Sequence, residues 1–167
     1  MHPVSKEAIG DRMSVTISGN KETVRMLEKL EHFLGSTKPM EGIVEDVKGR
    51  IEERTTKGRD YQNRSFAPYS EAYKKRKRKS KVDLRDTGKM LGALDTQVIT
   101  PIHGKVFIKS ESYGGKKRAR TDMIANIHTT GTGKQPQRDF MDITKTALEK
   151  FVKKHYDDKI MKILGRR

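Results

Sequence analysis

The residues of this chain that could do chemistry are few and scattered. The sequence contains no cysteine, which excludes thiolate nucleophiles, disulfides and cysteine-based zinc sites. The histidines do not share the short spacings of a zinc motif such as H-E-x-x-H, so we expect each to be structural. They are His2, His32, His103, His128 and His155. The sequence therefore predicts no metal-ligating residue.

A glycine-containing segment, Gly131–Lys134, has the look of a phosphate-binding loop. A P-loop would need Gly in place of His128 and Ser or Thr in place of Gln135, so the match fails. Adjacent carboxylates at 52–53 and 157–158 lie on charged helical stretches with no nucleophile or base implied beside them. We expect no catalytic residue, no cofactor-binding residue and no cofactor, and therefore a protein that is not an enzyme.

The strongest electrostatic feature is a run of six basic residues with a seventh just after it. Six successive cations on a helix repel one another, and a bound polyanion would relieve that cost without reading base sequence. A solvated helix face and a nuclear localisation patch are the alternatives. We expect contact with DNA or an acidic protein neighbour through this run and through a second basic segment. The residues are Lys74, Lys75, Arg76, Lys77, Arg78, Lys79 and Lys81, then Lys116, Lys117, Arg118 and Arg120.

Composition places the chain among highly charged proteins with a thin core. Of 167 residues, 32% are hydrophobic and 35% charged, so we expect neighbouring subunits to complete the burial. Residues 1–57 hold ten basic and ten acidic side chains, so the whole net charge of +15 falls on residues 58–167. This asymmetry favours a polyanionic partner. No run of about 18 apolar residues is present, so we expect a soluble, intracellular protein with no membrane contact.

Hydrophobic spacing predicts an α+β fold: a small antiparallel β-sheet packed with amphipathic helices and long basic loops. Helices are expected over residues 21–34, 37–57, 71–79, 88–94, 121–127 and 139–164. The first two should pack as an antiparallel helical hairpin. An edge strand is expected over 12–18, and a β-hairpin should turn at Gly104. We expect a single domain, 1–167, whose parts are 12–57, the basic segment 58–95, the hairpin 96–110 and the closing segment 111–167.

Three sequence blocks occur in a recognisable order. The first comprises Arg54, Thr55, Gly58, Asp60, Phe66, Pro68, Tyr69, Ser70 and Tyr73. The second comprises Val82, Asp83, Leu84, Thr87, Gly88, Lys89, Met90 and Leu91. The third comprises Ala125, Asn126, Ile127, His128, Gly131, Arg138, Asp139 and Phe140. Together they resemble the neck and tail-completion, or virion morphogenesis, proteins of tailed bacteriophages. The chain differs from the family pattern in carrying Asp139 where Pro is usual and Thr129 where Gln is frequent.

The resemblance implies a structural virion protein at the head–tail junction. Such proteins form hexameric or dodecameric rings that join tail to head and let DNA pass, and they contact portal or adaptor proteins and tail proteins. They carry no cofactor. The implied location is the virion, with host cytoplasm during assembly. The block residues from Arg54 to Phe140 are expected to hold the fold by capping and packing.

A ring needs two different adhesive faces on each subunit. We expect them on the exposed side of the hairpin 96–110 and on the helices that carry Met90-Leu91 and Met123-Ile124. The loops 58–68 and 113–120 are expected to order on assembly. A free-standing, non-specific nucleic-acid-binding module is the first alternative and would bind duplex DNA as an isolated subunit. A small hydrolase or nuclease is the second, with Asp83 and Asp86 the only acidic pair near the basic run.

Overall fold

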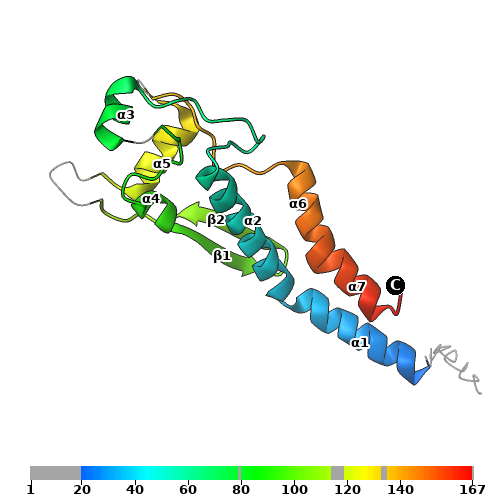
Figure 1. Ribbon diagram of the computed structural model, residues 1–167. Helices are drawn as coiled ribbons and strands as arrows, with labels where there is room; N and C mark the ends of the chain where they lie inside the picture. The colour runs from blue at the N-terminus through cyan, green and yellow to red at the C-terminus, as the bar shows by residue number, and fades with distance from the viewer. Residues whose placement is uncertain (1–19, 79, 114–118, 133–134, 167) are drawn as a thin grey trace, which may run out of the picture.

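A computed structural model describes residues 20–78, 80–113, 119–132 and 135–166. It is an α+β structure in which helices surround one two-stranded antiparallel sheet (Figure 1). The helices are α1 (Lys21–Gly35), α2 (Lys38–Thr56), α3 (Glu71–Lys77), α4 (Lys89–Gly92), α5 (Thr121–Thr130), α6 (Lys145–Val152), the π-helical turn η1 (Lys153–Asp157) and α7 (Asp158–Ile163). The strands are β1 (Leu94–Thr100) and β2 (His103–Ile108). The strand expected over 12–18 lies outside the described residues, as do Lys79 and the residues Lys116, Lys117 and Arg118.

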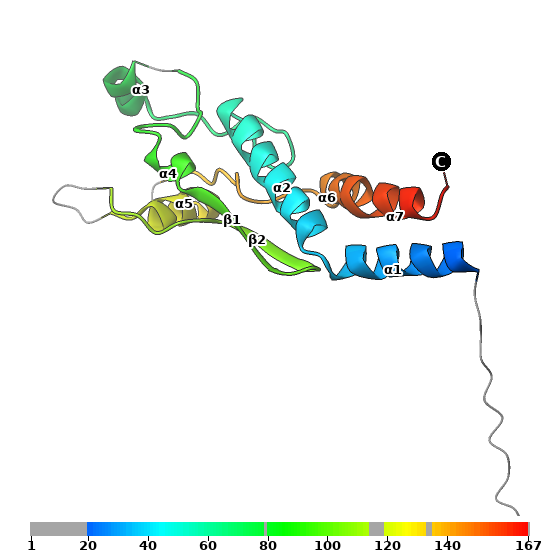
Figure 2. The same ribbon diagram turned by 90° about the horizontal axis from the view of Figure 1, so that it is seen from below.

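Helix α2 crosses the sheet and packs against both of its strands (Figures 1 and 2). Pro39 stands in its first turn, where a missing N–H costs nothing. Its buried residues include Ile43, Val44 and Ile51, at the spacing of one helical face. Ile51 is 1% exposed and belongs to the core cluster. The other buried members are Phe66, Val82, Leu84, Met90, Leu91, Leu94, Ala125 and Phe140.

The β-hairpin forms, but its turn is not at the expected position. The register pairs Leu94 with Ile108 and Val98 with Gly104, and the chain reverses at Pro101-Ile102. Gly104 is therefore inside β2. A Cβ there would lie 2.6 Å from Cγ1 of Val44, because α2 crosses the strand at this point. The glycine marks a close helix–sheet contact rather than a turn.

The expected antiparallel pairing of the first two helices is wrong. After α1 ends, the chain continues into α2 at an open angle, so the two helices diverge (Figures 1 and 2). Helix α1 instead lies beside α7, and the ring of Phe33 meets that of Tyr156, in the π-helical turn η1, edge-on at 6.1 Å. The side of α1 that carries Phe33 thus faces a segment more than a hundred residues away in sequence, while Val24, Leu27 and Leu34 stay exposed. Helix α1 and the C-terminal segment of α6, η1 and α7 form an arm that projects from the body of the molecule (Figures 1 and 2).

The C-terminal helix begins later than residue 139 and is not regular. Thr144 caps it, with its hydroxyl accepting from the N–H of Ala147, and η1 interrupts it before α7. Residues 139–143 belong to no regular element, and the guanidinium of Arg54 donates to the carbonyls of Phe140 and Asp142 within this segment.

Two further boundaries differ from expectation. Helix α4 is a single turn, because Leu94 pairs with Ile108 and so opens β1. Helix α5 continues to Thr130, into the segment that was expected to be a loop from Thr129. The loop 58–68 is held by hydrogen bonds within the chain: Asp60 accepts from the backbone N–H groups of Gln62 and Arg64. Among the described helices, none has the length and apolar character needed to cross a membrane.

The close contact at Gly104 gives the first testable outcome. Gly104→Ala should lower the free energy of unfolding by about 1–3 kcal/mol, because the stiff Val44 side chain cannot move aside. Gly49→Ala is the matched control, since nothing lies within 4 Å of a Cβ at that exposed position of α2. It should be stabilising by about 0.5–1 kcal/mol. Urea denaturation followed by circular dichroism measures both, and an unchanged midpoint for Gly104→Ala would contradict the packing argument.

Candidate nucleic-acid interface and assembly surfaces

The basic run forms the short helix α3 at the end of the molecule farthest from α1 (Figure 1). Ser70 caps this helix, and its hydroxyl accepts from the N–H of Tyr73 at 3.3 Å. The helix closes at Lys77, and Arg78 follows in the left-handed conformation with φ 53°. Repulsion among successive cations and the left-handed turn are consistent with so short a helix.

The cations of the run differ in their surroundings. Lys74 donates to Glu71 at 2.7 Å, and the guanidinium of Arg76 lies 4.9 Å from the centre of the Tyr73 ring. The exposed cations are Lys75, Arg76, Arg78 and Lys81. The helix and the link after it thus present positive charge to solvent. Such an arrangement can bind phosphates without reading bases.

The second basic segment is represented by Arg120, since residues 116–118 are outside the described chain. Arg120 donates to both carboxylate oxygens of Asp122, at 3.2 and 3.0 Å. Asp122 also accepts from the hydroxyl of Ser110 at 3.0 Å, and these bonds hold the pKa of this carboxyl below its usual value. Asp122 therefore links the start of α5 to the segment that follows β2, and Arg120 is its ion-pair partner.

The first and third motif blocks meet through a buried arginine at the end of α2. Arg54 is 5% exposed, and one of its terminal nitrogens donates to the carbonyl of Phe140 at 2.6 Å and to that of Asp142. Thr55 beside it is 0% exposed, as is Phe140. Burial lowers the pKa of Arg54, yet a guanidinium remains charged in proteins. Two backbone oxygens compensate the buried charge.

A second buried arginine links the same blocks from the other side. Arg138 donates to the carbonyls of Ala67 and Pro68 at 2.9 and 3.0 Å, and its guanidinium lies 5.2 Å from the centre of the Tyr69 ring. Tyr69 in turn accepts from the N–H of Leu84 at 3.2 Å, which brings in the second block. The three blocks are therefore one connected structure.

The second block also positions α4. The hydroxyl of Thr87 accepts from the N–H of Lys89 at 3.4 Å, and Gly88 has φ 80°. Met90 and Leu91 are 1% and 4% exposed. Their proposed place in an adhesive face is wrong, because both belong to the core.

His128 and Gly131 close helix α5. Gly131 has φ 71°, and a Cβ there would lie 2.8 Å from the N of Gln137. The carbonyl of His128 accepts from the N–H of Arg138 at 2.6 Å. Burial, with a smaller contribution from the Arg138 charge, lowers the pKa of His128 to about 4. The imidazole is neutral at physiological pH.

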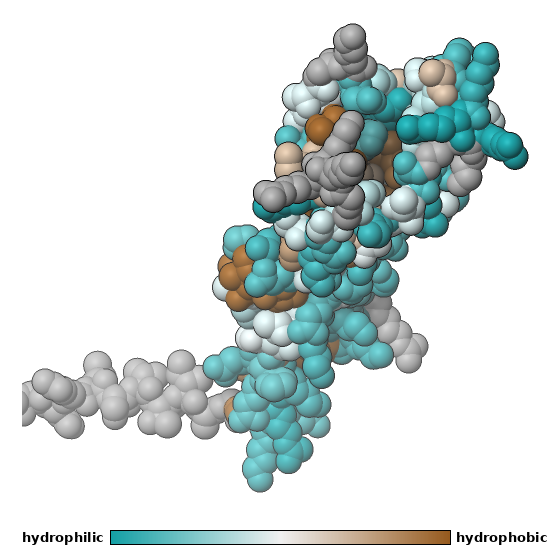
Figure 3. All heavy atoms as spheres, turned by 90° about the vertical axis from the view of Figure 1, so that its left-hand side faces the viewer, coloured by the Kyte–Doolittle hydropathy of each residue, from teal (hydrophilic) through white to brown (hydrophobic). Residues whose placement is uncertain are grey.

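Large apolar side chains remain exposed on four parts of the chain, and the face shown in Figure 3 is mainly hydrophilic with separate hydrophobic areas. None of the described residues of α1, α6, η1 and α7 is buried. The exposed set comprises Val24, Leu27 and Leu34 on α1, Ile99 and Ile102 on the hairpin, Met123 on α5, and Leu148, Val152 and Met161 on the C-terminal segment. Exposed apolar side chains mark contact with other proteins where they gather into one patch.

An ion-pair cluster joins the arm to α2, and sequence reasoning missed it. The Asp46 carboxylate accepts from Lys154 at 2.7 Å and lies 2.8 Å from Nε2 of His155. Burial opposes ionisation of Asp46, but these two bonds outweigh it and lower its pKa. The His155 ring lies over Gly42, where a Cβ would overlap with it. That glycine, inside an otherwise regular helix, was the available signal.

Nothing in the described parts of the chain groups three or more histidine or acidic side chains in a way that could hold a metal ion. What the arrangement offers chemically is charge and apolar surface.

The neutral state of His128 gives a pH prediction. In the unfolded chain His128 has its ordinary pKa of 6.5 and takes up a proton below that pH. In the folded protein its pKa is about 4, so the side chain stays neutral until the pH falls that far. Stability should therefore be fully present above pH 6.5 and decline as pH falls to 4, by about 2 kcal/mol after discounting for partial solvent contact. Urea midpoints of the wild type and His128→Gln across this window measure the effect. Parallel pH profiles for the two proteins would refute it.

The chain was compared with known proteins by sequence and by structure. No family model matches it, and no curated protein and no solved structure is significantly similar to it.

Proposed function

We propose that this protein is a structural subunit of the head–tail connector of a tailed bacteriophage, a neck or tail-completion ring. The observation that carries the proposal is the arm of α1, α6 and α7, whose apolar stripes are left unburied by the rest of the described chain. Leu27 is 54% exposed in the middle of α1. A helix with such a stripe is stable when another surface covers it.

A second copy of the chain is the occupant that fits this surface. Ring closure needs head-to-tail contacts between two different faces of each subunit. The arm supplies one face, and the hairpin supplies another through Ile99 and Ile102, which are 50% and 83% exposed. The two faces lie on different elements of an elongated molecule (Figure 2). Repetition of the arm-to-hairpin contact would build a hexameric or dodecameric ring.

The charge distribution supports a DNA channel. Residues 58–167 carry the whole net charge of +15, and exposed cations gather on α3 and the link after it. In a ring this charge would hold or guide the genome end by phosphate contacts alone. Portal or adaptor proteins above and tail proteins below are the proposed virion partners. The role is assembly and sealing, with no turnover.

The exposed cations on α3 also favour a second function, a free-standing protein that binds nucleic acid without sequence preference. The two functions differ in what a single subunit does. A ring subunit binds DNA weakly until it assembles, whereas the free-standing module binds fully as a monomer with a steep salt dependence.

Assembly through α1 can be tested with charge-matched variants. The double variant Val24→Glu/Leu27→Glu should keep the circular dichroism of the wild type and remain a monomer, because it places two carboxylates on the exposed stripe. Lys29→Glu on the same helix is the control, with the same change of two charge units at an exposed polar position. Native mass spectrometry and particle imaging at low and high concentration report the mass and shape. A wild type that stays monomeric at every concentration would rule out the ring.

Contact with DNA can be tested at the exposed cations. The triple variant Lys75→Ala/Arg78→Ala/Lys81→Ala should weaken duplex binding by the assembled protein for all sequences alike. It should also reduce the slope of log affinity against log salt by up to about 3, because each phosphate that is no longer neutralised lowers the slope by roughly one.

Removing three exposed lysines from the arm, at Lys29, Lys145 and Lys150, is the control for net charge and should change the slope less. Fluorescence anisotropy over a salt series measures both variants. Equal slopes for the two triple variants would count against a DNA role for α3.

A further inference from the structure

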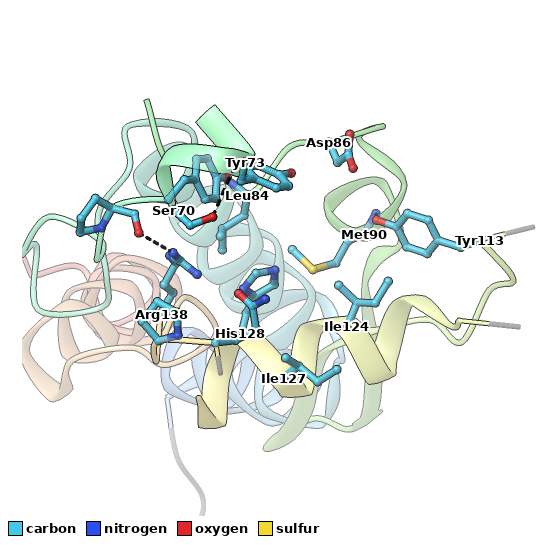
Figure 4. Close-up of a pocket in the computed structure, with 14 residues that line it drawn as sticks. Ser70, Tyr73, Leu84, Asp86, Met90, Tyr113, Ile124, Ile127, His128 and Arg138 are labelled. Atoms are coloured by element: carbon cyan, nitrogen blue, oxygen red, sulfur yellow. Dashed lines mark hydrogen bonds between the residues drawn. The ribbon is translucent and has the colours of Figure 1, made fainter. Parts of the chain in front are cut away.

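A cavity of about 530 Å³ opens between α3, α4, α5 and the segment that follows residue 134 (Figure 4). Its size is within the range of sites for small molecules or for inserted side chains. The three motif blocks all contribute to its walls. Neither the packing of the core nor the ring accounts for it.

The walls of the cavity are mostly apolar or aromatic. They include Leu84, Met90, Ile124 and Ile127, with Tyr69, Tyr73 and Tyr113. Tyr113 is fixed by accepting a hydrogen bond from the N–H of Met90 at 3.1 Å, and Tyr69 by its bond from Leu84. The cavity is thus largely pre-formed, which suits a flat or branched apolar group.

One end of the cavity is polar, and its donors are not used up. Arg138 is 2% exposed, and its Nε and Nη2 bind the carbonyls of Ala67 and Pro68, but its buried Nη1 has no partner among the described residues. Nδ1 of His128 is likewise buried without a partner in the described chain. Figure 4 shows both side chains directed into the cavity. Leaving such groups unsatisfied lowers stability, and more so when the group is charged.

The charge at this end selects the ligand. The Arg138 guanidinium is cationic, and the neighbouring imidazole is neutral because its pKa is about 4. A neutral imidazole has one N–H group. The Arg138 guanidinium and the His128 imidazole can therefore each donate a hydrogen bond to the same planar anion. Asp86, the one acidic side chain among the described lining residues, is exposed to solvent. An amine or a second cation would find only repulsion beside Arg138.

We propose that this cavity binds a carboxylate carried on an apolar body. One carboxylate oxygen accepts from Nη1 of Arg138 and the other from Nδ1–H of His128, while the apolar part packs against Met90, Ile124 and Ile127. The same chemistry is offered by a small organic acid and by an acidic side chain flanked by apolar residues on another protein. The proposal does not rest on the ring and can fail or stand independently of it.

The probe is 3-phenylpropionate, with the uncharged 3-phenylpropanamide as its matched control. Titration of the full-length protein followed by NMR should give saturable shifts at the methyl groups of Met90, Ile124 and Ile127, with a Kd of about millimolar for so small a ligand. The amide should bind at least tenfold more weakly, because it has no negative charge to pair with the guanidinium of Arg138. Equal binding of acid and amide, or shifts that map elsewhere, would overturn the proposal.

Variants on one face of α5 complete the test. Ile127→Trp should fill the cavity and abolish binding, whereas Met123→Trp adds the same bulk at a 55% exposed position outside the cavity and should leave binding unchanged. His128→Leu should weaken binding of the acid severalfold with less effect on the amide, and it serves if Ile127→Trp does not fold. Retained binding in a folded Ile127→Trp protein would sink the idea.

The mass of the protein assembly, measured with and without 3-phenylpropionate, shows where the natural carboxylate comes from. If saturating 3-phenylpropionate dissociates oligomers of the wild type, the occupant comes from a second copy of the chain. If the mass is unchanged, the occupant is another molecule of the same chemistry.

Discussion

Two buried guanidinium groups hold the body of this protein together. Arg54 binds the carbonyls after residue 139 from the end of α2, and Arg138 binds the carbonyls before α3 from the other side. Each cation satisfies backbone oxygens that no sheet or helix could reach, since the segments concerned are irregular. A two-stranded sheet alone is too small to organise a chain of this length. The arginine–carbonyl hydrogen bonds connect distant segments of the chain, as additional strands would in a larger sheet.

The molecule thus consists of a well-packed body and an arm whose helices contain no buried residue among those described. The body contains the core cluster and the cavity, and its buried charges restrict how far it can rearrange. The arm is attached to the body chiefly through the Asp46 cluster, and the edge contact of Phe33 with Tyr156 holds the two parts of the arm together. Solvent-exposed ion pairs contribute little individually. The arm is consequently the part whose stability depends most on what covers it.

The local patterns of the sequence predicted most elements but not their partners. Apolar spacing identified α1, α2 and the hairpin, and the expected start of α3 at residue 71, after Ser70, is confirmed. Pairing of α1 with α2 failed because a short connection permits an open angle as readily as a hairpin. The role of Gly104 was misread because a close helix contact and a turn demand the same residue. The late start of α6 had a local signal in Thr144, a capping residue, which a reading by apolar spacing alone passed over. Met90 and Leu91 face inward, as the spacing of their helix indicated, while the resemblance to virion proteins stays a prediction.

The π-helical turn η1 has a consequence for how the arm can vary. A π turn holds one residue more than an α turn, and here it falls between the part of the C-terminal helix that faces α2 and the part that faces α1. Loss of one residue from Lys153–Asp157 would restore a regular helix and rotate everything beyond it by about 100°. The side of α7 that faces α1 would then rotate away from it while the body kept its packing. A single-residue deletion in η1 could therefore change which side of α7 faces outward during evolution without altering the core of the body.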